Sequence, residues 1–187
     1  LFPYTTLFRS GKTPVISHQS LRWFIIKRGD KYAIRLRDLE GEYLKAFHGI
    51  EHFPADAKWK IKAKFIPTVG KKVTIIDITG RSYQEDSPGL LEFVVDGKTY
   101  RLEAGPGETK EDFFVVFGDA TNKISTYGGG RFLDTKGFNP DGTVTLDFNK
   151  AYNPPCAFTP FATCPLPTKE NKLPVAIPAG EKNAGHH

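Results

Sequence analysis

The sequence predicts a mainly β protein, an antiparallel sandwich or partly open barrel of about eight to ten strands with a proline-rich C-terminal wrap. Short runs of β-branched and aromatic residues recur at a spacing of roughly 8 to 12 residues. No long amphipathic helix interrupts them. Seven prolines between Pro154 and Pro178 forbid a regular central strand or helix there, so we expect this tail to wrap the strands.

The first ten residues share no pattern with the rest of the chain. The stretch LFPYTTLFRS resembles the conceptual translation of a common short-read sequencing adapter, and the chain contains no Met. We therefore expect residues 1–10 to be non-native and residues 11–187 to form a single β-rich domain, the C-terminal part of a longer protein. A signal peptide on the missing part stays open, so both the cytoplasm and the periplasm or cell envelope remain as locations.

Two strand pairs are expected in the first half of the chain. Residues 20–38 read as a hairpin around Gly29-Asp30, with one buried face and one face bearing arginines. Residues 59–67 and 72–79 are expected to pair across Val69-Gly70. The irregular stretch between these pairs, residues 41–57, is expected to be a loop or short helical turn.

The next pair is the clearest, because residues 90–95 and 98–104 flank Asp96-Gly97, a favoured two-residue hairpin turn. The continuous apolar run Phe113 to Phe117 is typical of a strand covered on both faces. Shorter strands are expected at 124–127, 131–134 and 143–148.

Composition excludes several classes of function. The formal net charge is +5, but the positive residues are spread among acidic ones. In the nearest basic cluster, Lys58 to Lys64, lysines alternate with apolar residues, as in a strand with one solvent-exposed face. We therefore expect no nucleic-acid partner. No stretch approaches the roughly 20 apolar residues of a membrane span. The sequence indicates no cofactor and leaves the oligomeric state open.

His48 to His52 spell H-x-x-E-H, the inverted zincin pattern. A zinc site of this kind needs a stable helix, whereas Gly49 lies inside the motif and Phe53-Pro54 ends it. We interpret these residues as a loop and predict no metal site.

Gly128 to Gly130 precede Arg131 and allow two interpretations. Successive glycines with an arginine can cradle an anion through converging N–H groups. The favoured alternative is a tight turn between short strands, with Arg131 pairing a carboxylate.

Cys156 and Cys164 lie eight positions apart, a spacing that fits neither a zinc ribbon nor a thioredoxin-like motif. A disulfide in an oxidising compartment, buried free thiols, and a metal ligand or nucleophile all stay open, in that order of preference.

Hydrogen-bonding side chains are dense beside the apolar strands of the C-terminal third: Asp119, Thr121, Thr126, Tyr127, Arg131, Asp147, Asn149, Tyr152 and Asn153. They form either a polar network that pins the tail or the floor of a polar pocket. The region lacks histidine, the commonest general acid or base, and shows no nucleophile elbow.

Two segments, FGDATNKISTYGGGRFLD and LDFNKAYNPPCAFTPFATCPLPTKENKLPVAIPAGEK, carry a resemblance to a known family. They closely resemble the bacterial and archaeal domain-of-unknown-function family 1684, and the likeness extends over residues 17–182. Family members typically carry a further N-terminal β-rich portion, in some cases behind a signal or lipoprotein sequence. The resemblance implies importance, with no established catalytic role, for Asp119, Thr126, Tyr127, Arg131, Asp147, Asn149, Asn153, Cys156, Cys164, Glu170, Asn171 and Glu181.

The leading functional hypothesis is a β-domain that binds a small polar or anionic ligand in a pocket formed by strands 113–148 and the tail. In this hypothesis Arg131 holds the ligand while Asp147 and Asn149 orient it. The predicted ligand-binding set is Asp119, Thr126, Tyr127, Arg131, Asp147, Asn149, Asn153, Glu170 and Asn171. One alternative is a hydrolase that uses Asp119 with Asp147 or Glu170, or Cys156 as nucleophile. Another is a cell-envelope structural or interaction module.

Overall fold

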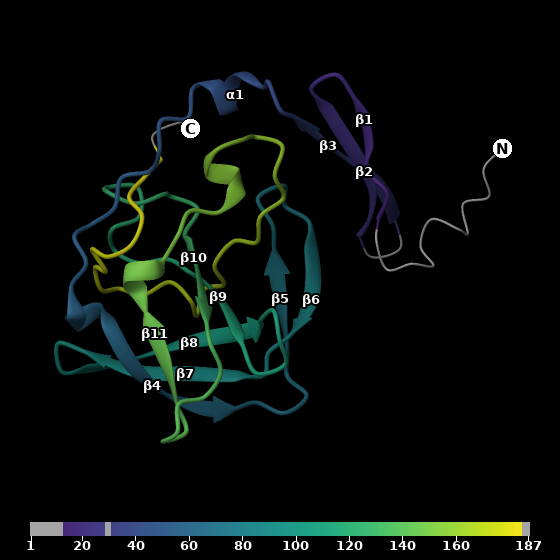
Figure 1. Cartoon of the computed structure of the whole chain (residues 1–187). Helices are drawn as coiled ribbons and strands as arrows, with labels where there is room; N and C mark the ends of the chain where they lie inside the picture. The colour runs from purple at the N-terminus through teal and green to yellow at the C-terminus, as the bar shows by residue number, and fades with distance from the viewer. Residues whose placement is uncertain (1–12, 29–30, 185–187) are drawn as a thin grey trace. The chain divides into compact units, whose positions relative to one another are not determined.

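The computed structural model describes residues 13–28 and 31–184, so the predicted non-native segment and the Gly29-Asp30 turn lie outside the described residues. Contacts divide the chain into two compact units, Leu1–His48 and Gly49–His187 (Figure 1). The expectation of a single domain from residue 11 onward stays a prediction.

The first unit is a three-stranded antiparallel sheet followed by one helical turn. Strands β1 (Ile16–His18), β2 (Leu21–Arg28) and β3 (Lys31–Asp38) are adjacent in that order, and α1 spans Glu42–Lys45. The predicted pairing of β2 with β3 is confirmed. The predicted buried face is wrong. Every residue of β3 is exposed, because the described part of this unit has no second layer to cover the sheet.

The second unit is built on a six-stranded antiparallel sheet in the order β10-β9-β8-β7-β4-β11. Its strands are β4 (Lys60–Pro67), β7 (Gly89–Val95), β8 (Lys98–Pro106), β9 (Phe113–Phe117), β10 (Arg131–Thr135) and β11 (Thr143–Asp147). The outer strands β10 and β11 lie beside each other, so the sheet curls into a nearly closed barrel (Figure 1). The predicted mainly β, antiparallel class is confirmed.

Smaller elements complete the second unit. Strands β5 (Lys72–Ile76) and β6 (Ser82–Asp86) form a separate hairpin. Three short 3₁₀ turns, η1 (Ala57–Trp59), η2 (Phe148–Lys150) and η3 (Pro155–Ala157), lie outside the strands. No helix within residues 13–28 and 31–184 is long and apolar enough to cross a membrane.

The hairpin of β7 and β8 is confirmed, and its turn has positive φ at both Asp96 and Gly97, the geometry of a type I′ turn. The predicted pairing of β4 with β5 is wrong, since β4 pairs with β7 and β11. Gly89 explains the β4–β7 contact. A Cβ on this residue would lie 2.3 Å from Cε2 of Phe65, so the aromatic ring occupies the space that the glycine leaves empty.

One predicted strand is also wrong. Residues 124–127 belong to a compact loop in which Lys123 adopts a φ of 65° and Asn122 forms an isolated bridge with Thr126. The short polar strand β6 escaped prediction because its sequence, SYQED, lacks an apolar alternation.

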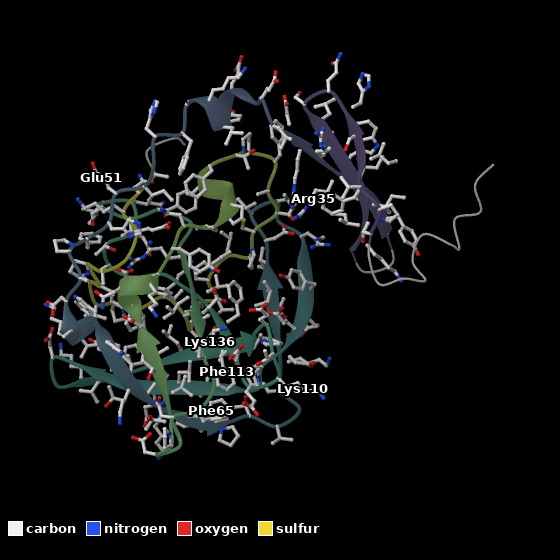
Figure 2. All side chains as sticks on the ribbon, in the orientation of Figure 1. Arg35, Glu51, Phe65, Lys110, Phe113 and Lys136 are labelled. Atoms are coloured by element: carbon white, nitrogen blue, oxygen red, sulfur yellow. The ribbon has the colours of Figure 1, made fainter. Side chains whose placement is uncertain are left out.

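Two apolar clusters lie on opposite faces of β9. Phe113, Val115 and Phe117 contribute to the main core inside the barrel. Phe114 and Val116 pack against a second cluster formed by Phe132, Cys156 and Cys164. The run from Phe113 to Phe117 is thus covered on both faces, as predicted. At one end of the core Phe65 stacks on Phe113, with ring centroids 5.0 Å apart (Figure 2).

The proline-rich tail wraps the barrel in the way its sequence predicts. Its backbone joins the end of β5 through Leu166 N–H to Ile76 O at 2.9 Å. Further on it runs beside the end of β9, where Leu173 N–H donates to Gly118 O at 2.8 Å. The tail therefore connects the β5–β6 hairpin to the barrel.

Candidate functional site

A groove of about 590 Å³ lies between β5 and the tail in the second unit. Its lining combines cationic and apolar residues from three segments: Lys71, Lys72, Val73, Thr74 and Ile76 around β5, Glu103 on β8, and Leu166, Pro167, Thr168, Lys169, Glu170 and Lys172 on the tail. The volume falls within the usual range of small-molecule sites.

Hydrogen bonds fix the groove at both ends. At one end, Ile78 N–H donates to Cys164 O, and Leu166 N–H donates to Ile76 O, each at 2.9 Å. At the other end, the buried side chain of Asn171 holds the tail against the barrel. The tail residues between these points, 167–170, form one wall.

The Asn171 side chain bridges β8 and β9 where their backbone pairing ends. Strands β8 and β9 pair only at Gly105 with Phe114 and Pro106 with Phe113. Beyond that point the Asn171 amide donates from Nδ2 to the carbonyl oxygens of Glu103 and Val116, both at 2.9 Å. Its Oδ1 accepts from Glu103 N–H at 2.7 Å. One side chain thus satisfies three backbone groups that a continuous ladder would pair.

The rim of the groove carries an excess of positive charge. Lys71 pairs with the buried Glu103 at 2.5 Å, and Lys72 pairs with Asp86 at 3.0 Å. Lys169 and Lys172 are exposed and form no ion pair with any described residue. These two ammonium groups on one wall are therefore available to an anion.

A small recess of about 30 Å³ adjoins the groove. It shares Val73, Glu103, Leu166 and Thr168 with the groove and adds apolar walls from β8 and β9. The carboxylate of Glu85 also lines it and has no hydrogen bond or ion pair with a described residue. Burial, with a smaller contribution from neighbouring Asp86, raises the pKa of Glu85.

Arg131 and Asp119 lie elsewhere, in a fully buried ion pair with 2.7 Å between Nη2 and Oδ2. Arg131 also donates to the carbonyl oxygens of Ile177 and Ala179, and its guanidinium lies 5.2 Å from the Phe117 ring. Burial lowers the pKa of Arg131, and Asp119 opposes that shift. The turn with a carboxylate pair, rather than an anion cradle, is the arrangement observed.

The other side chain contacts of Asp119 explain why the loop after β9 is compact. Its Oδ1 accepts from the backbone N–H of Thr121 at 2.8 Å and from the Thr121 hydroxyl at 2.5 Å. That hydroxyl lies 2.8 Å from Oγ1 of the buried Thr126. With a side chain that has no exposed surface, Asp119 faces its own loop and the tail rather than solvent.

The remaining predicted residues are dispersed. Asn149 bridges η1 and β11, because its Nδ2 donates to Asp56 O and to Asp147 Oδ1, each at 3.0 Å. Asn153 holds the far end of the tail by donating from Nδ2 to Lys182 O at 2.7 Å. Of the predicted set, Glu170 lines the groove and Asn171 lines the small recess beside it, so the structure does not bring the whole set into one place.

Cys156 and Cys164 are free thiols, so the predicted disulfide is not confirmed. Cys156 N–H donates to the Cys164 sulfur at 3.2 Å, and the Tyr127 hydroxyl donates to Cys156 O at 3.3 Å. A hydrogen bond from Cys164 lowers the pKa of Cys156 to about 7, and burial raises the pKa of Tyr127 to about 12. The two buried thiols and the half-buried Tyr127 side chain pack together with Phe132 of β10.

The H-x-x-E-H stretch takes part in ordinary backbone pairing, with His52 in an isolated bridge to Glu181. Throughout residues 13–28 and 31–184, no three His, Cys, Asp or Glu side chains gather in a way that could hold a metal ion.

Sequence reasoning missed the lysines of the groove and Glu85. The lysines gave no signal because Lys71-Lys72 and Lys169 to Lys172 are far apart in the chain. For Glu85 the sequence did contain a signal. It follows Tyr83 at a spacing of two, so a strand here places a carboxylate on the same face as an aromatic ring.

Comparison with known proteins agrees with the resemblance carried by the sequence. None of the curated proteins matches the chain. An uncharacterized protein of Haloarcula marismortui, solved by solution NMR, has a similar structure with a TM-score of 0.60 and 29% sequence identity. The likeness covers 76% of this chain and 80% of that one. The family model described as "Protein of unknown function (DUF1684)" matches residues 45–182, and the chain belongs to that family.

Proposed function

We propose that the second unit binds a small anionic molecule in the groove between β5 and the tail. The observation that carries this proposal is the pair of exposed lysines, Lys169 and Lys172, on the wall of a 590 Å³ groove without a carboxylate partner among the described residues. Lysine side chains provide flexible point charges suited to carboxylate or phosphate groups.

The lining of the groove favours a ligand with an apolar part. Val73 and Ile76 from β5 and Leu166 and Pro167 from the tail contribute apolar atoms to it. An apolar surface beside ammonium groups suits a short carbon chain that ends in an anionic group, because each part then meets a matching surface.

This proposal keeps the ligand class expected from the sequence and changes the residues that hold the ligand. The hydrogen bonds of Arg131 to Asp119, Ile177 and Ala179 lie inside the protein. Glu170 and Asn171 retain a place in the proposal, Glu170 on the rim and Asn171 as the fixed end of the wall.

Isothermal titration with hexanoate and with butyl phosphate tests the proposal. We expect at least one of them to bind with an affinity that falls as salt rises, because the contact is electrostatic. The double variant Lys169→Gln/Lys172→Gln should bind at least about tenfold more weakly, or about 1.4 kcal/mol.

The matched control is Lys98→Gln/Lys110→Gln, which removes the same charge from two exposed lysines that do not line the groove. Equal loss of affinity in both double variants would show that net charge, and not the groove, attracts the anion. Absence of binding by every anion tested would refute the proposal.

A further inference from the structure

The recess beside the groove contains a carboxylate without a partner among the described residues. Glu85 lies on β6, in register with Val73 of β5, and alternation along the strand turns its side chain inward with that of Tyr83. It forms no hydrogen bond or ion pair with a described residue, although its surroundings include Ile75, Phe114 and Leu166. Half-burial among these apolar groups disfavours the ionised form of the carboxyl unless a donor or a cation joins it.

Nearby charged groups are already committed to other partners. Glu103 accepts from the Ser87 hydroxyl at 2.8 Å and pairs with Lys71. Asp86, the neighbour of Glu85, is exposed and pairs with Lys72. Glu85 is therefore the carboxylate of the recess that remains free to meet a ligand.

The recess has room for one small group. Its volume of about 30 Å³ exceeds the roughly 10 to 15 Å³ that a cavity needs to hold one water molecule. A primary ammonium is similar in size to a water molecule and carries three donors, whereas a guanidinium is larger. Gly105 helps to keep the space open, since a Cβ there would lie 3.3 Å from Glu85 Oε2 and 3.4 Å from Phe114 O.

We propose that the ligand of the groove is a zwitterion whose primary ammonium enters the recess and contacts Glu85 while its anionic group lies against Lys169 and Lys172. This inference rests on the proposed function and specifies its ligand class. The two parts of the site have opposite charge: an unpaired carboxylate in the recess and unpaired ammonium groups on the wall of the groove. Glu85 is half-buried, so water screens an ammonium contact there less than it screens one on the open surface.

The test compares ω-amino carboxylates of three to six carbons with the plain carboxylates of equal length, by isothermal titration of the full chain. At the length that spans the site, the amino carboxylate should bind at least about tenfold more tightly than its partner. Glu85→Gln should abolish that advantage and leave the affinity for the plain carboxylate unchanged. Glu108→Gln, at an exposed glutamate outside the recess, should keep the advantage.

The outcomes separate this inference from the proposed function. If plain carboxylates bind as tightly as amino carboxylates at every length, the zwitterion is refuted while anion binding stands. If Glu85→Gln weakens both series equally, the contact between the ammonium and Glu85 is refuted. If neither series binds the wild-type protein, the proposed function fails and the inference fails with it.

Discussion

Replacing Asp119 with Asn should destabilise the second unit severely. The substitution preserves the shape of the side chain but removes the charge that faces Arg131, whose side chain has no exposed surface. Breaking a buried ion pair by removing one partner costs about 3 to 5 kcal/mol, because the other charge stays buried without compensation. Domains have a total stability of about 5 to 15 kcal/mol, so this loss is a large fraction of it.

Urea denaturation followed by tryptophan fluorescence measures the effect. The chain has two tryptophans, Trp23 in the first unit and the buried Trp59 in the second. In a Trp23→Phe background the signal reports on the second unit alone. With an m-value of about 2 kcal/mol/M, a loss of about 4 kcal/mol lowers the urea midpoint by about 2 M.

The matched control is Arg101→Gln, which breaks the pair of Arg101 with Glu92 on the outer face of β7 and β8. The Arg101 side chain is 61% exposed, so we expect a change of at most about 1 kcal/mol. A loss below about 1 kcal/mol for Asp119→Asn would contradict this reasoning, because breaking a fully buried ion pair should cost several times more than breaking an exposed one.

Three other contacts can be tested by substitution or labelling. Asn171→Ala should lower the free energy of unfolding by about 3 kcal/mol, since it removes three hydrogen bonds of about 1 kcal/mol each. An unchanged urea midpoint would show that the bridge between β8 and β9 does not stabilise the protein. Glu85→Gln should raise the melting temperature at pH 7, because the raised pKa of Glu85 means that its ionised form destabilises the fold. That gain should vanish as the pH falls below the ordinary glutamate value of 4.5, and a gain independent of pH would refute it. In the native protein the rate of Cys156 alkylation by iodoacetamide should rise with a midpoint near pH 7, and Tyr127→Phe should move that midpoint upward, as peptide mapping can show; no movement would mean that the hydroxyl has no part in the thiol pKa.

Short sequence motifs predict the parts of the fold that depend only on residues close together in the chain. Asp96-Gly97 suits a tight turn in any context, so it predicts the β7–β8 hairpin that the structure contains. Val69-Gly70 is also a turn, but a turn does not choose a partner strand. The partner of β4 is decided by distant residues, such as Gly89, whose missing side chain accommodates Phe65. Such complementarity between segments has no signature within either one.

The candidate site also has features that the sequence shows directly and features that depend on contacts between distant segments. The density of polar residues from Asp119 to Asn153 is visible in the sequence, yet most of these side chains bond to backbone groups of the tail or of nearby loops. A polar side chain that satisfies buried backbone and one that awaits a ligand look identical in a sequence. Only the path of the tail decides between them, and that path brings Lys169 and Lys172 opposite β5.

The insertion of the tail between β5 and β9 also bears on the order in which the protein can fold. Asn171 bonds to Glu103 across 68 positions, and Arg131 bonds to Ile177 across 46. During synthesis the strands leave the ribosome well before residues 171–179. Until those residues are made, the unpaired part of β8 and β9 lacks the side chain of Asn171, and the guanidinium of Arg131 lacks the carbonyl oxygen of Ile177. Such distant closures slow folding and prolong the exposure of unpaired strand edges. We therefore expect nascent chains that stop before the tail to depend on chaperones, although they already contain every strand of the barrel.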